Sequence, residues 1–103
     1  MGIARHEADG ANKLRRTVKA RYCYIPQVVA IYCVPAIAGK IIFWIFTGET
    51  HFDRSLREVL LSEELRILDE FPELEFSIEY VPAIFCDSHA EITGDNADLV
   101  FIN

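Results

Sequence analysis

An apolar run at residues 28–46 limits the folds open to this chain more than any other feature. It holds nineteen consecutive residues with a single charge, Lys40. Such a run has to leave water, either across a bilayer or inside a protein core. A proline and a glycine lie within residues 35–39, and β-branched and aromatic side chains dominate both flanks. These features favour strands at 27–34 and 40–47, joined as an antiparallel hairpin, over one membrane span.

The following segment has the pattern of a helix and then a strand. Apolar residues recur at the helical period through residues 53–71, and a proline follows that ends the helix. Residues 74–81 alternate between apolar and polar, which predicts a strand with one face in water. With 40–47 these elements predict a right-handed βαβ unit with parallel strands. Residues 82–97 are expected to be irregular, and 98–102 to form a short last strand.

The beginning of the chain is less regular. Residues 1–12 show no apolar period and are predicted to be a mobile segment. Residues 13–24 fit a helix, with Leu14, Val18 and Tyr22 on one stripe, and they also fit a strand, because apolar and basic residues alternate there. The helix is favoured, because lysine and arginine suit its exposed face.

The predicted class is α+β, with residues 13–103 as a single domain. A chain of 103 residues buries roughly two thirds of its unfolded surface, enough for one core. The sheet is expected to be small and mixed, with the hairpin leading into the βαβ unit. A ferredoxin-like split arrangement is one topology that fits this order.

The βαβ prediction brings polar loops together. Ligands of open α/β sheets tend to bind outside the carboxyl ends of the strands, where this chain places residues 47–53 and 86–91. The charged, thiol and imidazole side chains of these loops are Glu49, His51, Asp53, Cys86, Asp87, His89 and Glu91. From these we take four residues as the candidate ligand or metal site: His51, Asp53, Cys86 and His89.

Two kinds of chemistry fit these four residues. Imidazole, thiolate and carboxylate groups are zinc ligands, so His51, His89 and Cys86 or Asp87 could hold Zn²⁺. Cys86 could also act as a nucleophile with a histidine base. The acidic surroundings would raise a thiol pKa and oppose this second role. No phosphate-binding, dinucleotide or serine-hydrolase motif occurs, so the sequence favours a non-enzymatic protein without a cofactor.

Charge is divided unevenly along the chain. Residues 1–21 hold six of the ten Lys and Arg residues and only two acids, whereas the remainder holds fourteen acids and four bases. A basic arm on an acidic body indicates self-association or a charged partner. Nucleic-acid binding by the arm is the alternative, but the acidic body would repel phosphate. An arm that lies on an acidic face of its own domain, or of a second copy, is the favoured interpretation.

The predicted helix is apolar over a wider face than one sheet would cover. Leu61, Leu65 and Leu68 extend beyond the main stripe, and large uncovered apolar patches usually mark interfaces. They are the candidate interface residues. The sequence therefore favours a homodimeric interaction module that binds a protein or small molecule, with a metal-dependent or thiol enzyme as the alternative.

The cysteines bear on the compartment. Cys23, Cys33 and Cys86 are odd in number and form no C-x-x-C motif, which argues against a secreted disulfide framework. The first twenty residues lack the apolar stretch of a signal peptide. We expect a cytoplasmic, acidic protein that does not enter a membrane.

Overall fold

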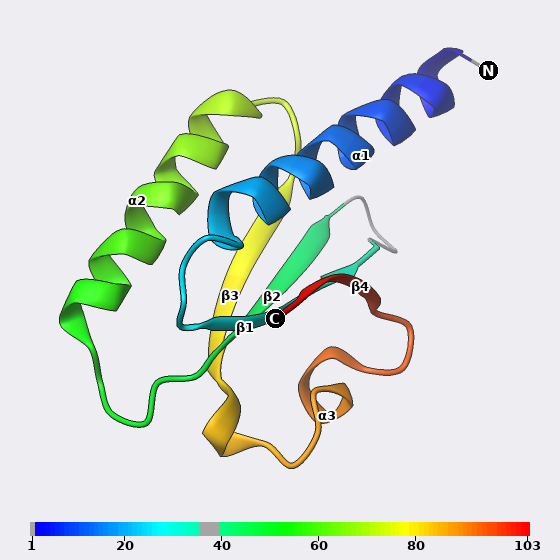
Figure 1. The fold of residues 1–103 in the computed structure, drawn as a ribbon. Coiled ribbons are helices and arrows are strands. Elements are labelled where there is room, and N and C mark those ends of the chain that lie inside the picture. Colours follow the sequence, from blue (N-terminus) through cyan, green and yellow to red (C-terminus); the bar gives the residue numbers. More distant parts are fainter. Residues whose placement is uncertain (1, 36–39) are drawn as a thin grey trace.

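The computed structural model describes residues 2–35 and 40–103, with side chains described from Asp9 onward in the first helix. Figure 1 shows two long helices on the same side of a curved sheet. The elements in chain order are α1 (Gly2–Tyr22), β1 (Val28–Val34), β2 (Ile41–Thr47), α2 (Arg54–Glu70), β3 (Phe76–Pro82), the 3₁₀ turn η1 (Ala83–Phe85), α3 (Ala90–Thr93) and β4 (Asp98–Ile102).

The apolar run folds as the predicted hairpin. β1 and β2 pair antiparallel, with Ile31 opposite Ile45 and Cys33 opposite Phe43. Residues 36–39, where most of the predicted turn falls, lie outside the described residues. None of the helices in the described part of the chain combines the length and hydropathy needed to cross a membrane.

The predicted βαβ unit is also present. β2 and β3 pair in parallel from Ile41 opposite Phe76 to Thr47 opposite Pro82, and α2 connects them. β4 pairs antiparallel with β1, which completes a mixed sheet of order β3-β2-β1-β4. The α+β class is therefore confirmed. In a split ferredoxin-like arrangement another strand lies between the two parallel strands of a βαβ unit. In this sheet β2 and β3 are direct neighbours.

Helix α1 resolves the ambiguity at residues 13–24 in favour of the helix. Leu14, Val18 and Tyr22 are fully buried at the spacing of successive turns. The helix extends back to Gly2, so the residues predicted as a mobile segment are helical from that point. Alanine, the strongest helix former, recurs in this stretch, a local preference that an apolar period does not reveal.

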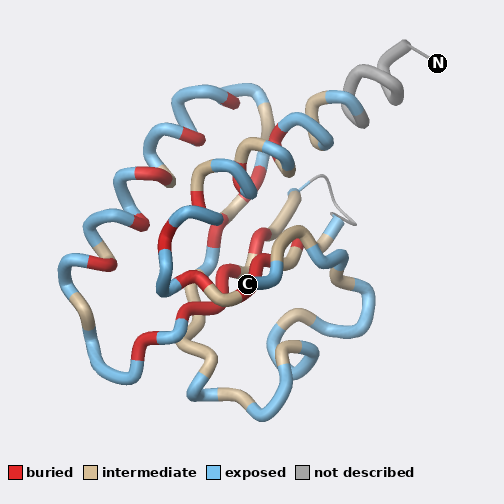
Figure 2. Tube along the Cα trace, viewed as in Figure 1, coloured by how far each residue is buried: buried red, intermediate tan, exposed pale blue. Residues whose placement is uncertain are grey.

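One continuous core lies between the helices and the sheet. Figure 2 shows buried positions along the inner faces of the helices and through the central strands. The fully buried Phe43 and Ile45 of β2 pack with Leu60 and Ile67 of α2 and with the α1 stripe in one cluster. Burial of apolar side chains is the main favourable term in folding, so this two-layer core holds the strand ends in place.

The second face of the sheet has a different covering. Side chains alternate along a strand, so Tyr32 and Phe46 point away from the long helices. His89, which precedes α3, stacks on Phe46 with ring centroids 4.2 Å apart and bonds the Tyr32 hydroxyl through Nδ1 at 2.9 Å. Residues 83–97 thus form a thin covering over part of this face, and Figure 2 shows that most of it is exposed or half-buried.

Candidate functional site

The carboxyl ends of β2 and β3 meet at one edge of the sheet, as the βαβ prediction requires. Thr47 and Pro82 are the last paired residues of the two strands. We call residues 47–57 and 82–85 at this end the carboxyl edge. The chain leaves β2 closely: the Gly48 N–H donates to the Gln27 carbonyl at 2.7 Å, and a Cβ at Gly48 would lie 3.3 Å from Val29 Cγ1.

Glu49 is the buried charge of this edge. Its side chain is 5% exposed, and Oε1 accepts hydrogen bonds from the Thr47 hydroxyl at 3.2 Å and from the Arg57 guanidinium. Among the described residues, no donor reaches its other oxygen, Oε2, which is also closed to solvent. Since buried polar atoms nearly always have a partner, Oε2 is an unusual feature that calls for an explanation.

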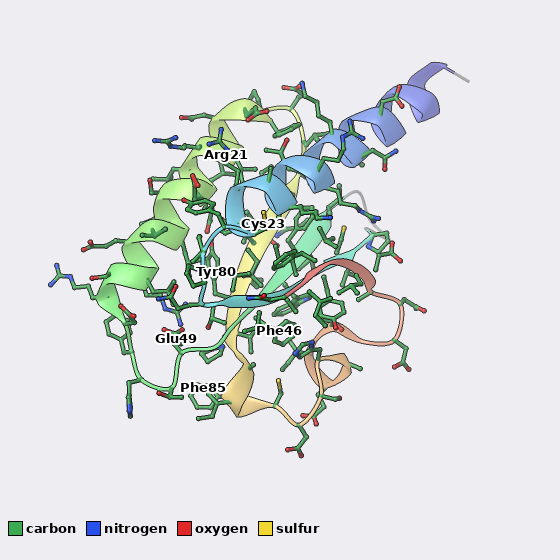
Figure 3. The ribbon with its side chains drawn as sticks, in the orientation of Figure 1. Arg21, Cys23, Phe46, Glu49, Tyr80 and Phe85 are labelled. Atoms are coloured by element: carbon green, nitrogen blue, oxygen red, sulfur yellow. The ribbon has the colours of Figure 1, made fainter. Side chains whose placement is uncertain are left out.

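A small cavity of about 210 Å³ adjoins Glu49. Figure 3 shows Glu49 and Phe85 at the same end of the molecule, and both line this cavity. Pro82 and Phe52 add apolar surface, and Phe52 and Phe85 are 79% and 78% exposed. The two phenylalanines thus give this edge an exposed aromatic surface beside the buried Glu49 carboxylate.

Two of the four predicted site residues lie at this edge. His51 is exposed and lines the same cavity. Asp53 is the N-cap of α2, and its Oδ1 accepts a hydrogen bond from the Leu56 N–H at 3.0 Å. The side chain of Asp53 therefore satisfies a helix end.

The other two residues make local contacts further along the chain. The half-buried Cys86 thiol donates to the Ala83 carbonyl at 3.5 Å, and His89 bonds Tyr32 on the second face of the sheet. Within the described ranges, no group of three or more His, Cys, Asp or Glu residues is arranged to hold a metal ion.

The candidate interface residues are exposed on α2. Leu61 and Leu65 are each 53% exposed and Leu68 is 41% exposed. Their neighbours Leu60 and Ile67 are buried against the sheet. The helix thus presents one leucine row to the core and a second leucine row to the outside.

The basic helix pairs with acids of the body. Arg15 contacts Asp98 at 3.0 Å, and Arg21 lies 3.8 Å from both Glu63 and Glu70. These contacts support the interpretation in which the arm lies on an acidic face of its own domain. Arg15 and Arg21 thus have carboxylate partners within the chain.

A tyrosine pair links the two long helices to the sheet. The hydroxyls of Tyr22 and Tyr80 lie 2.8 Å apart, and Tyr80 also donates to the Leu60 carbonyl or to Glu64 Oε1, at 3.2 and 2.9 Å. Burial raises the pKa of both tyrosines above the usual value of 10.0, and neighbouring glutamates add to the shift. The pair is uncharged at neutral pH and acts as a structural joint.

The sequence did not single out Arg57, Phe52 or Phe85, and it included Glu49 only as one of several loop acids. The sequence does contain a clue to the Glu49–Arg57 pair. Glu49 follows Thr47-Gly48 at a strand end, and Arg57 lies in the first turns of the next helix.

Comparison of the chain with protein-family models, curated proteins and solved structures finds no match.

Proposed function

We propose that this chain is a small non-enzymatic binding module, acting as a homodimer, that holds its ligand at the carboxyl edge. The observation that carries the proposal is the cavity beside Glu49, with Phe52 and Phe85 exposed at its walls. Binding sites combine apolar surface with a few placed polar groups, and this edge has both. Its position agrees with the general location of ligands at the carboxyl ends of parallel strands.

The contacts of the thiol and imidazole groups support binding over catalysis. A nucleophilic cysteine needs a base within hydrogen-bond reach. Cys86 and His89 bond Ala83 and Tyr32, respectively, and not each other. His51 lines the cavity, where it is available to a ligand. Three free cysteines are in keeping with a reducing, cytoplasmic setting.

Ligand binding at this edge is tested by screening a fragment library with amide-resolved NMR. We expect bound fragments to shift the signals of residues 48–57 and 82–86, because these segments line the cavity. Phe85→Ala should remove the shifts, and Leu99→Ala should retain them, since Leu99 is an exposed apolar residue of β4. Fragments that shift only other regions, or no fragments at all, would contradict the proposal.

The homodimer is supported by the outer leucine row of α2. Leu61, Leu65 and Leu68 lie on successive turns and are about half exposed. A twofold axis beside this helix would bury the same row from both copies, the commonest way to close an oligomer. Such an interface is apolar, so its strength should depend little on salt.

Light scattering after size exclusion tests the dimer at low and high salt. We expect a dimer at both, and Leu65→Glu should produce a monomer, because two carboxylates would be buried in the interface. Leu99→Glu is the matched control, because Leu99 and Leu65 are both 53% exposed. A wild-type monomer would contradict the dimer, and loss of the dimer only in Leu99→Glu would place the contact on the sheet.

A further inference from the structure

The unpaired oxygen of Glu49 carries information about the ligand. The Glu49 side chain is held in place by Thr47 and Arg57 through Oε1, whereas Oε2 has no donor among the described residues. An ionised carboxylate only accepts hydrogen bonds. A ligand group that satisfies Oε2 must therefore be a donor, and another carboxylate or a phosphate would be repelled there.

The charge of Glu49 favours a ligand whose hydrogen-bond donor is positively charged. A hydrogen bond to a carboxylate is stronger when the donor is also ionised. Arg57 and Thr47 already share Oε1, so Oε2 is the oxygen of this cavity-lining carboxylate that lacks a donor among the described residues. A compact ammonium, with three donors on a single atom, suits a single acceptor better than the planar fork of a guanidinium.

The walls select an apolar group of limited size. The cavity volume is about 210 Å³, while a cavity of about 150 Å³ is known to hold benzene. This volume is enough for one ring. Phe52 and Phe85 line the cavity with Glu49 and offer aromatic surface on which an apolar ring can pack.

We propose that the carboxyl edge binds a small primary amine, with its ammonium group on Glu49 Oε2 and one ring-sized apolar group against Phe52 and Phe85. This inference rests on the proposed function, whose ligand class it specifies. Oε2 is closed to solvent in the ligand-free chain, so entry requires a wall side chain to rotate. Phe52 and Phe85 are two of the exposed residues of the lining, so their side chains have space to rotate.

Three probes of similar shape test the chemistry: 2-phenylethylamine, 2-phenylethanol and 3-phenylpropanoate. Each is titrated into the intact chain and followed by amide-resolved NMR at neutral pH. We expect the amine to bind at least about tenfold more tightly than the alcohol, because its hydrogen bond to Glu49 is charge-assisted on both sides. The carboxylate should bind more weakly than the amine, because Glu49 repels its charge, although Arg57, which also lines the cavity, attracts it.

Three variants test which residues cause the difference in affinity between the amine and the alcohol. Glu49→Gln should lower the affinity for the amine by about tenfold and change the affinity for the alcohol by less. Phe85→Ala should weaken the binding of amine and alcohol alike. This variant should fold normally, because the Phe85 side chain is exposed. Glu75→Gln, an exposed acid outside the cavity, should leave all three affinities unchanged. If Glu49→Gln does not fold, the wild-type comparison of amine with alcohol decides.

The outcomes separate this inference from the proposed function. Equal affinities for amine and alcohol, or an amine affinity unaffected in folded Glu49→Gln, would overturn the amine assignment and leave binding at the carboxyl edge standing. Failure of the amine to bind would also overturn it. The proposed function falls only if the broader fragment screen also finds no ligand at residues 48–57 and 82–86.

Discussion

The hydroxyl of Tyr22 on α1 lies 2.8 Å from the hydroxyl of Tyr80 on β3, and both lie within reach of the Leu60 carbonyl on α2. Three elements that are far apart in the sequence are therefore joined through one pair of side chains. Figure 3 shows Tyr80 between α2 and the sheet. Tyr22 is buried, Tyr80 is half-buried and both lie next to glutamates, so loss of a hydroxyl proton from either tyrosine is unfavourable in the folded chain.

Alkaline pH should destabilise the fold through this pair. Burial raises the pKa of Tyr22 and Tyr80 above 10.0. From about pH 10 upward the unfolded chain releases tyrosine protons that the folded chain retains, so the free energy of unfolding falls as pH rises. The fully buried Tyr22 contributes a slope of about 1.4 kcal/mol per pH unit. Denaturant unfolding at several pH values measures it.

Variants of the pair provide the control for this slope. Tyr22→Phe should remove the contribution of Tyr22, and the double variant with Tyr80→Phe should remove most of the remainder. Both variants should be less stable than the wild type at neutral pH, because each loses a buried hydrogen bond. An alkaline slope that is the same in the double variant and the wild type would contradict the assignment.

Leu60→Ala should destabilise the chain strongly. The Leu60 side chain is 1% exposed and packs in the cluster between α2 and the sheet. Its removal leaves a cavity, and such changes cost about 2–5 kcal/mol. Leu99→Ala, on an exposed leucine, should change the free energy of unfolding by only about 0.5 kcal/mol. Denaturant unfolding of both variants tests this, and equal effects would contradict the burial of Leu60.

The arrangement of strands and long helices was predictable because it follows from side-chain period. The apolar run indicates two strands, the stripe of 53–71 a helix and the alternation of 74–81 a strand. Connection rules then make the two strands of the βαβ unit parallel. The start of α1 was not predictable in the same way. Helix formation there follows local propensity, and the sequence of residues 1–12 has no apolar period that marks it.

The carboxyl edge was predictable in position and only partly in composition. Strand direction located the loops, but the roles of individual side chains depend on distances that spacing does not give. Arg57 reaches back to Glu49 across the helix start, and His89 crosses to the second sheet face because residues 83–97 fold over it. Phe85 would be expected in a core from its apolar character, whereas it is exposed.

The cysteines should differ in reactivity. Cys23 is exposed, whereas Cys33 is buried between β2 and β4. Burial raises the pKa of the Cys33 thiol, and the nearby Arg15 opposes this only in part. Because the thiolate is the reactive form, a disulfide reagent at neutral pH should modify Cys23 first and Cys33 only after unfolding. Cys23→Ser should remove the fast phase. A fast phase that persists in this variant and is lost in Cys33→Ser would contradict the prediction.

Asp53→Ala should lower the free energy of unfolding by about 1 kcal/mol, because it removes the cap of α2. The Asp53 carboxylate accepts a hydrogen bond from the Leu56 N–H at 3.0 Å, and without it that donor loses its partner. Asp53→Asn should retain most of the stability, since asparagine caps equally well. Asp69→Ala removes an exposed acid at the other end of α2 and should not destabilise, because a negative charge is unfavourable near a helix C-terminus. If Asp53→Asn were as destabilising in denaturant unfolding as Asp53→Ala, the charge of Asp53 at the helix N-terminus, and not its hydrogen bond, would be the stabilising feature.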